Sequence, residues 1–247
     1  MVTIETVSYT KIAFKSMIHK YGKITKYTVL QKISITMQAL KLVVIGPLEN
    51  LCVVLFIFFI ILNKKIFQSG KTTVSNFLAD ASEIPYNYHP TYGVRILEAE
   101  AQGIIVNNRT ISKDIEIWDC SGDFKFKTCW PAIRKDLHGV MLIYSAKKQN
   151  CLKEIQEFYD YFVTQTKLGP DMCVIFCYDP DRTLSELPKS ISSTFPKVSH
   201  VRCDIEESGN KLQADFRSFL SSLMTKMQDY LDQEENTILT DNILFAK

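Results

Sequence analysis

The sequence predicts an α/β fold in which a mostly parallel six-stranded sheet carries helices on both faces. Short apolar runs alternate with amphipathic stretches from residue 40 onward, which is typical of parallel strands joined by crossover helices. The first apolar run ends at Gly46, and the triplet Gly70-Lys71-Thr72 opens the next helical stretch. This order is typical of a phosphate-binding loop between a strand and a helix.

Six apolar runs are the expected strands, and three longer stretches are the expected helices. The strands are LKLVVI ending at residue 45, VRILEAE from 94, DIEIW ending at 118, GVMLIY from 139, MCVIFC from 172 and VSHVRC ending at 203. Helices are expected at 72–80, 149–165 and 208–229. The last helix places apolar residues on one face, as in an ordinary core helix: Leu212, Phe216, Phe219, Leu220, Leu223 and Met227.

The 247 residues, 46% of them hydrophobic, fit one globular domain with extensions. Residues 1–36 carry six lysines against one glutamate and are interpreted as a basic N-terminal extension, with an alternative start at Met37. The domain is expected to span 37–229, with an apolar insert at 51–68. Residues 230–247 are expected to form a polar, frayed tail.

Charge and cysteine usage exclude several classes of protein. A net charge of +2 argues against a nucleic-acid binder that depends on phosphate contacts. Seven cysteines without a C-x-x-C pair indicate reduced, mostly buried thiols. The N-terminal residues lack the pattern of a secretion signal. Since no cysteine follows Cys203, we expect no prenylation site and no lipid anchor.

The phosphate-loop sequence is split into two halves. GPLEN at 46–50 is followed by eighteen residues and then by SGKTT at 69–73, so that omitting the insert joins the halves as GPLENSGKTT. In such loops successive backbone amides wrap the phosphates, the lysine reaches the outer phosphates, and the hydroxyl after it binds magnesium. The candidate residues are Gly46, Glu49, Asn50, Ser69, Gly70, Lys71, Thr72 and Thr73, with Thr72 also a Mg²⁺ ligand.

The insert contains an unbroken run of twelve apolar residues at 51–62. As a helix this run would be about 18 Å long, too short to span a hydrocarbon core of about 30 Å. We interpret residues 51–68 as an in-frame retained intron, because their amino acids have AT-rich codons and the closing Ile-Phe-Gln can encode a splice acceptor. Alternatively, residues 51–62 with Lys64 and Lys65 lie in a bilayer interface.

Two further segments contain candidate Mg²⁺ and phosphate ligands. The strand DIEIW runs directly into DCSGD, which matches the W-D-x-x-G element of small GTPases. There Asp119 would hold Mg²⁺ through water, and the amide of Gly122 would face the terminal phosphate. The polar aromatic loop PYNYHPTYG at 85–93 resembles switch I of Ras-like proteins, in which Thr91 would bind Mg²⁺ and the terminal phosphate.

Two departures from the small-GTPase pattern affect catalysis and base recognition. Asp123 stands where active enzymes usually have a glutamine that orients water, and its charge would repel phosphate, so we expect slow hydrolysis. After the fifth strand only Asp181 matches the N-K-x-D element, as an acceptor for guanine, and the lysine is absent. The sixth strand ends in Arg202-Cys203-Asp204 without a clear S-A-K element, so the sequence leaves guanine specificity open.

Taken together, these segments resemble the Rab-like small GTPase subunit of intraflagellar transport complex B over about residues 39–240. The resemblance lies in GPLEN joined to SGKT, PTYGVRILE, WDCSGD with FKFKTCWPAI, and KDLHGV. It implies a P-loop small GTPase fold that binds GTP or GDP with Mg²⁺ and docks on coiled-coil subunits of complex B. It also implies a role in cilium assembly or ciliary trafficking, at the cilium, the ciliary base and the cytoplasm.

Three other functions remain open at this stage. An active GTPase switch in vesicle traffic is opposed by Asp123 and by the missing lipid site. A membrane-tethered P-loop protein would use residues 51–62, and a P-loop kinase would not need the W-D-x-x-G element. The four histidines form no evident catalytic set with a nucleophile.

Overall fold

The computed structural model describes residues 38–48, 69–81, 91–148, 150–166, 168–205 and 208–245. Residues Leu40–Met227 form one compact unit, and this unit contains the sheet. Residues 1–36, Glu49, Asn50, the insert and most of the switch-like loop, on which several predictions fall, lie outside the described residues.

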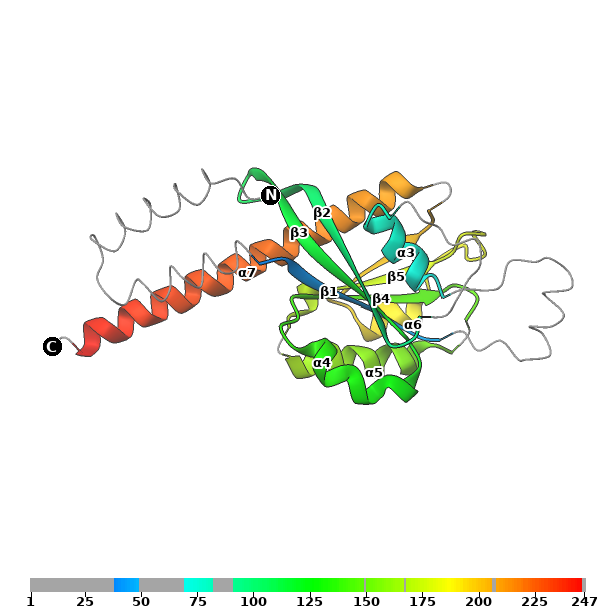
Figure 1. Cartoon of the computed structure of the whole chain (residues 1–247), viewed down its shortest axis with the longest axis horizontal. Helices are drawn as coiled ribbons and strands as arrows, with labels where there is room; N and C mark the ends of the chain where they lie inside the picture. The colour runs from blue at the N-terminus through cyan, green and yellow to red at the C-terminus, as the bar shows by residue number, and fades with distance from the viewer. Residues whose placement is uncertain are drawn as a thin grey trace, which may run out of the picture. The chain divides into compact units, whose positions relative to one another are not determined.

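The described part of the chain contains a single six-stranded sheet in the order β2-β3-β1-β4-β5-β6 (Figure 1). Neighbouring strands are parallel except for the antiparallel pair β2 and β3. The predicted mostly parallel six-stranded sheet is therefore confirmed. The strands are β1 Leu40–Ile45, β2 Val94–Val106, β3 Arg109–Cys120, β4 Gly139–Ser145, β5 Cys173–Tyr178 and β6 Ser199–Cys203.

Helices cover both faces of the sheet, as predicted. On one face Trp130, Phe158 and Ile191 from α4, α5 and α6 pack into one apolar cluster, and on the other Val74 from α3 and Leu220 from α7 belong to a second cluster. The helices are α3 Lys71–Leu78, α4 Trp130–Arg134, α5 Leu152–Phe162, α6 Lys189–Thr194 and α7 Gly209–Phe245, with 3-10 turns η1 Phe124–Cys129, η2 Thr164–Thr166 and η3 Pro170–Met172.

The structure differs from the sequence-based expectation at three places. Helix α7 continues to Phe245, where a frayed tail was expected, because no glycine or proline follows Gly209 to end it. Strands β2 and β3 are longer than predicted, since Asn107 and Asn108 both adopt positive φ and join them in a tight hairpin turn. Helices α4 and α6 were not predicted, because they are too short to show a periodic pattern of apolar residues.

A buried lysine connects β1 to the end of α4. The Nζ of Lys41 donates to the backbone oxygen of Lys135 at 2.8 Å and lies 3.6 Å from the ring centroid of Trp118. Because the last carbonyls of a helix have no partner within it, this ammonium stabilises the end of α4. It also holds α4 against the strand that leads into Asp119.

Two further predictions concern thiols and membranes. Within the described residues the cysteines are free, and all but the exposed Cys129 are buried, as expected. No helix among these residues has both the length and the apolar character needed to cross a membrane. Residues 51–62, the candidate interfacial segment, lie outside the described part.

Candidate functional site

The two halves of the split phosphate loop meet in the structure. Gly46, Pro47 and Leu48 follow β1, and Ser69 leads through Gly70 into α3. The Nζ of Lys71 donates to the backbone oxygen of Pro47 at 2.9 Å and to the Oγ of Ser69 at 2.7 Å. Lys71 is only 6% exposed. Residues from both sides of the insert therefore converge on one buried ammonium group.

Two glycines allow the backbone to approach closely at this point. A Cβ on Gly122 would lie 2.0 Å from the oxygen of Gly46 and 3.1 Å from the Nζ of Lys71. Gly70 has a φ of 83°, and a Cβ there would lie 2.3 Å from the ring of Tyr178. No side chain fits at either position without displacing backbone or an aromatic ring.

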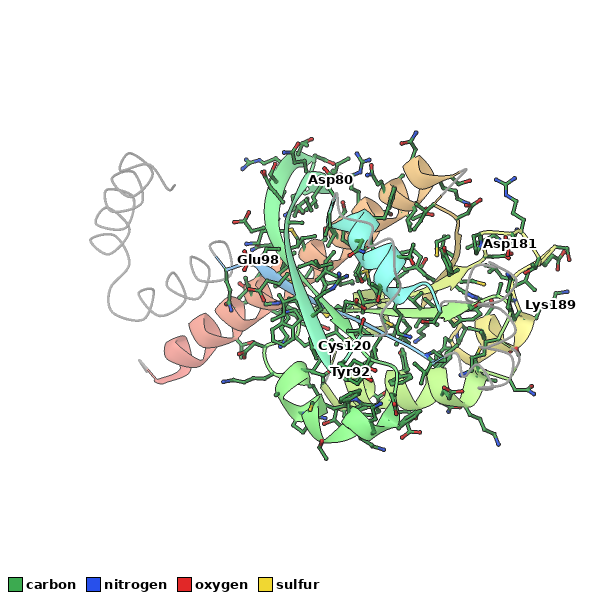
Figure 2. All side chains as sticks on the ribbon, turned by 45° about the vertical axis from the view of Figure 1, so that its right-hand side comes forward. Asp80, Tyr92, Glu98, Cys120, Asp181 and Lys189 are labelled. Carbon is green, nitrogen blue, oxygen red and sulfur yellow. The ribbon has the colours of Figure 1, made fainter. Side chains whose placement is uncertain are left out.

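Three oxygen-bearing side chains gather beside the loop. The Oγ1 of Thr72 donates to the Oδ2 of Asp119 at 2.9 Å and lies 3.0 Å from the Oγ1 of Thr91. Thr91 also donates to that carboxylate oxygen, at 3.3 Å. Figure 2 labels Tyr92 and Cys120, the chain neighbours of Thr91 and Asp119, close together. The structure thus brings the three predicted magnesium ligands into one cluster.

The Asp119 carboxylate is fully buried, and its other oxygen, Oδ1, has no hydrogen-bond partner in the structure. Burial raises the pKa of Asp119 above its ordinary value, although the hydrogen bond from Thr72 and the charges of Arg95 and Lys71 lower it. An unsatisfied buried carboxylate oxygen is costly. Hard oxygen donors of this kind suit Mg²⁺, so these residues fit the metal that the motif implies.

One functional candidate that the sequence analysis missed is Arg95 on β2. Its Nη2 donates to the Oδ1 of Asn76 at 2.5 Å and lies 3.3 Å from the Oδ2 of Asp119. A signal was present in the sequence. In β2, Arg95 shares its register with Leu97 and Ala99, which pack on the core, so a charge at this position is unexpected.

Asp123 is engaged in local structure. Its carboxylate accepts from the backbone amide of Lys125 at 3.0 Å and forms an ion pair with the Nζ of Lys125 at 2.8 Å. These hydrogen bonds hold the pKa of Asp123 below its ordinary value. Asp123 therefore acts as the cap of η1, and its oxygens are directed to Lys125.

At the expected base-recognition end, Asp181 is 60% exposed and forms an ion pair with Lys147 from the loop after β4. Figure 2 shows Asp181 in a loop well separated from Tyr92. Asp181 is thus accessible, but Lys147 already occupies its carboxylate.

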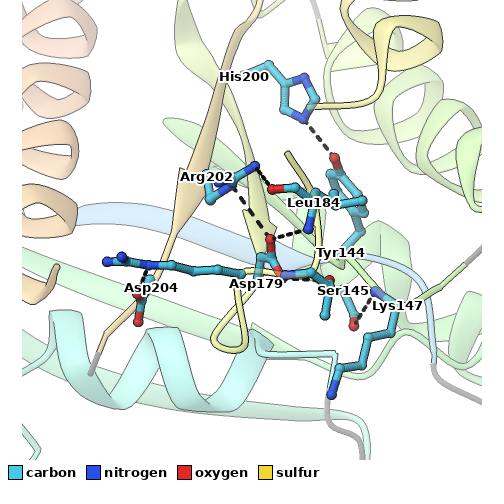
Figure 3. Close-up of polar contacts among 10 residues, drawn as sticks. Tyr144, Ser145, Lys147, Asp179, Leu184, His200, Arg202 and Asp204 are labelled. Carbon is cyan, nitrogen blue, oxygen red and sulfur yellow. Dashed lines mark hydrogen bonds and ion pairs between the residues drawn. The ribbon is translucent and has the colours of Figure 1, made fainter. Parts of the chain in front are cut away.

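The neighbouring Asp179 holds this loop together (Figure 3). Its fully buried carboxylate accepts from the amide and hydroxyl of Thr183, both at 2.8 Å, and from the amide of Leu184 at 3.1 Å. The guanidinium of Arg202 lies 3.6 Å away. Burial by itself would raise the pKa of Asp179, but these hydrogen bonds and Arg202 hold it below its ordinary value. Sequence reasoning did not distinguish its structural role.

The joined phosphate-loop sequence is one residue longer than the pattern it resembles. The phosphate-loop pattern has four residues between its two glycines, but the joined sequence GPLENSGKTT has five between Gly46 and Gly70. Assigning Asn50 to the insert, which then spans 50–68, restores the spacing. Glu49 and Asn50 lie outside the described residues, and Thr73 lies in the first turn of α3.

Known proteins resemble this chain in sequence and in fold. The Ras family model matches residues 60–179, a range that begins within the insert. The intraflagellar transport protein 22 homolog of Rattus norvegicus is 37% identical over 174 residues, which cover 70% of this chain and 94% of the relative. The chain belongs to the intraflagellar transport protein 22 family of Ras-like small GTPases.

Other relatives match over similar lengths. The Homo sapiens homolog is 36% identical, with 94% of its length covered. The intraflagellar transport associated protein 2 of Caenorhabditis elegans is 26% identical over 192 residues, which cover 64% of this chain and 75% of the relative. The GTP-bound crystal structure of T. brucei IFT22/74/81 contains a chain that superposes with a TM-score of 0.54 at 20% identity, covering 78% of this chain and 99% of that one. This superposition supports the small-GTPase fold.

Proposed function

We propose that this chain binds GTP or GDP together with Mg²⁺ and serves as a Rab-like subunit of intraflagellar transport complex B. The observation that carries the proposal is the convergence of Pro47, Ser69 and Lys71 beside the cluster of Thr72, Thr91 and Asp119. A buried ammonium at a helix N-terminus attracts phosphate, and a buried carboxylate with two hydroxyls suits a divalent cation.

Most of the predicted residues have a role in this site. Lys71 would contact the outer phosphates, and the backbone amide of Gly122 would face the terminal phosphate. Thr72, Thr91 and Asp119 would hold Mg²⁺, which would offset the negative charge of the phosphates. The backbone of the loop would wrap the remaining phosphate oxygens: Gly46, Glu49, Ser69, Gly70 and Thr73. Asn50, first predicted to be part of the loop, would belong to the insert, because the phosphate-loop pattern has only four residues between its glycines.

Guanine recognition would rest on Asp181. A carboxylate accepts from the N1 and N2 hydrogens of guanine, and Asp181 is accessible in its loop. Asp179 is unsuited to this role because Thr183, Leu184 and Arg202 occupy its oxygens. Binding of guanine would therefore displace or share the ion pair between Asp181 and Lys147.

Hydrolysis by this chain would be slow. Asp123 stands at the water-orienting position, and its oxygens are held by the amide and ammonium of Lys125. A carboxylate held in this way has neither the amide nor the freedom that a catalytic glutamine uses. This engagement also weakens the alternative of an active switch in vesicle traffic.

The assembly role is supported by the family. Relatives with 94% of their length covered are named intraflagellar transport protein 22 homologs, and the T. brucei crystal structure that superposes on this chain is of IFT22/74/81. By this analogy the chain would dock on coiled-coil subunits of complex B and act in cilium assembly or ciliary trafficking. It would be found in the cilium, at the ciliary base and in the cytoplasm.

Removal of the insert tests the nucleotide site. GDP binding is measured by calorimetry for the full chain and for a chain lacking residues 50–68. We expect the shortened chain to bind GDP at micromolar or lower Kd and the full chain to bind at least about tenfold more weakly, because closing a longer loop costs more entropy.

A chain in which residues 50–68 are replaced by the same number of glycines and serines is the matched control. It should bind as weakly as the full chain, since loop length is then unchanged. No GDP binding by the shortened chain would overturn the proposed nucleotide site.

A further inference from the structure

Arg95 connects the magnesium-ligand cluster to two other elements. It lies on β2, and its Nη2 reaches the Oδ1 of Asn76 on α3 at 2.5 Å and the Oδ2 of Asp119 at the end of β3 at 3.3 Å. The Arg95 side chain is 38% exposed, whereas that of Asp119 is fully buried. The guanidinium thus places a positive charge next to a carboxylate that water does not reach.

The oxygen that Arg95 approaches is the one shared by the neighbouring hydroxyls. The Oδ2 of Asp119 accepts from Thr72 at 2.9 Å and from Thr91 at 3.3 Å, while Oδ1 has no hydrogen-bond partner. A divalent cation held by these ligands would have the same sign of charge as the guanidinium of Arg95, and like charges repel strongly in a partly buried site. Arg95 therefore stabilises the ionised Asp119 carboxylate when the metal is absent and weakens binding of the metal when it is present.

We propose that Arg95 is a positioning residue that sets how strongly Mg²⁺ and nucleotide binding are coupled in this chain. The inference rests on the proposed nucleotide site. With Arg95 in place, the Asp119 carboxylate keeps a compensating charge after the metal leaves, so that bound nucleotide survives metal loss better than it would without this arginine. With Arg95 neutralised, the carboxylate attracts Mg²⁺ more strongly, and loss of the metal costs more.

The geometry also offers a purely structural role, which the experiment must separate. Arg95 joins α3 to the β2–β3 hairpin through Asn76, and that hydrogen bond could act without any effect on the metal. Arg95→Gln removes the charge, and Arg95→Lys keeps it. Asn76→Ala breaks the bridge to α3 and leaves the guanidinium beside Asp119.

The experiment measures release of mant-GDP as a function of Mg²⁺ concentration, in the full chain and in parallel in the chain lacking residues 50–68. For Arg95→Gln we expect the Mg²⁺ concentration that gives half-maximal slowing of release to fall about tenfold, which corresponds to about 1.4 kcal/mol. Release in EDTA should become faster. Arg95→Lys and Asn76→Ala should stay within about threefold of the parent.

Arg217→Gln is the control for an equal change of net charge. Arg217 lies on α7, where its side chain bonds the backbone oxygen of Gln213, and it should leave the Mg²⁺ dependence unchanged. An unchanged Mg²⁺ dependence in Arg95→Gln overturns the proposal. The same shift in Asn76→Ala as in Arg95→Gln also overturns it, because the bridge to α3 would then be responsible.

Thermal unfolding without nucleotide distinguishes failure of this proposal from failure of the proposed nucleotide site. Arg95→Gln removes the ionic partner of the buried Asp119 carboxylate and should lower the melting temperature by about 5 °C in EDTA. Arg95→Lys keeps the positive charge and should retain most of the parent's melting temperature. If no form of the chain binds mant-GDP, the proposed nucleotide site is wrong. The difference in melting temperature still tests whether Arg95 stabilises the Asp119 carboxylate. Equal melting temperatures in Arg95→Gln and the parent would contradict it.

Discussion

The phosphate end and the base end of the candidate site are organised in different ways. At the phosphate end, separate segments converge: Pro47 and Ser69 contact Lys71, while Thr72 and Thr91 contact Asp119. At the base end a single loop folds on itself around Asp179. The phosphate end retains polar groups that face a common centre, whereas the base end uses its most buried carboxylate for its own structure. This contrast predicts that nucleotide affinity comes mainly from the phosphates.

The largest expected effect is at Lys71. Lys71→Ala in the chain lacking residues 50–68 should weaken GDP binding by about 3 kcal/mol, because a buried, charge-assisted phosphate contact is lost. Lys147→Ala, which removes a lysine at the base end, should change the affinity less than about threefold. Calorimetric titration of both variants with GDP measures the difference. Similar losses in the two variants would erase the contrast between the two ends.

The next effect concerns the stability of the base-end loop. Asp179→Ala should lower the free energy of unfolding by about 3 kcal/mol, because two partly buried amide hydrogen bonds are lost and Arg202 loses its ionic partner. The exposed Asp181→Ala should change it by less than about 0.5 kcal/mol. Urea unfolding followed by circular dichroism gives both values. A small effect of Asp179→Ala would mean that the loop does not depend on this carboxylate.

A smaller effect is expected on base selectivity. If Asp181 accepts from guanine, Asp181→Asn should reduce the preference for GDP over ADP about tenfold, the usual effect of weakening a hydrogen bond to a charged group. Affinity for inorganic pyrophosphate should not change, because it makes no base contact. An unchanged preference for GDP over ADP would mean that residues other than Asp181 recognise guanine. It would also mean that the base end departs further from the small-GTPase pattern.

The smallest expected effect concerns His200 on β6, beyond the base-end loop. Its Nε2 lies 2.8 Å from the hydroxyl of Tyr144, and burial lowers its pKa to about 4 (Figure 3). Because the unfolded chain binds this proton more readily, stability should be complete above about pH 6.5 and should fall as the pH drops toward 4. We expect a loss of about 1 kcal/mol, reduced by the partial exposure of the ring. His200→Gln should flatten the unfolding profile over this range, and a parallel profile would contradict the assignment.

Most of the fold could be predicted from the sequence because it depends on local patterns. The apolar runs gave the six strands, and the stripe of Leu212, Phe216 and Leu220 gave the start of α7. The hairpin turn at Asn107 and Asn108 was missed, although an Asn pair is a turn signal. The end of α7 was predicted too early because the polar composition was interpreted as fraying. The helix continues because residues with good helix propensity continue along this segment.

The candidate site was predictable where a motif fixes both residue type and spacing. Lys71, Thr72, Asp119 and Gly122 fall in such motifs, and the structure brings them together. Arg95 was not predicted because its partners come from α3 and β3, and only the finished sheet places them side by side. For the same reason the sequence could not distinguish the roles of Asp179 and Asp181, since the difference depends on how the loop closes.

The chain has two tryptophans, and they lie on either side of the turn that follows β3. Trp118 immediately precedes Asp119 and stacks under the ammonium of Lys41, and the buried Trp130 begins α4 directly after the turn that Asp123 caps. Because indole emission responds to nearby charge and solvent, the intrinsic fluorescence of the unlabelled protein should report changes in how α4 packs against β3. The chain therefore contains its own optical probe, with no competing indole elsewhere to obscure the signal.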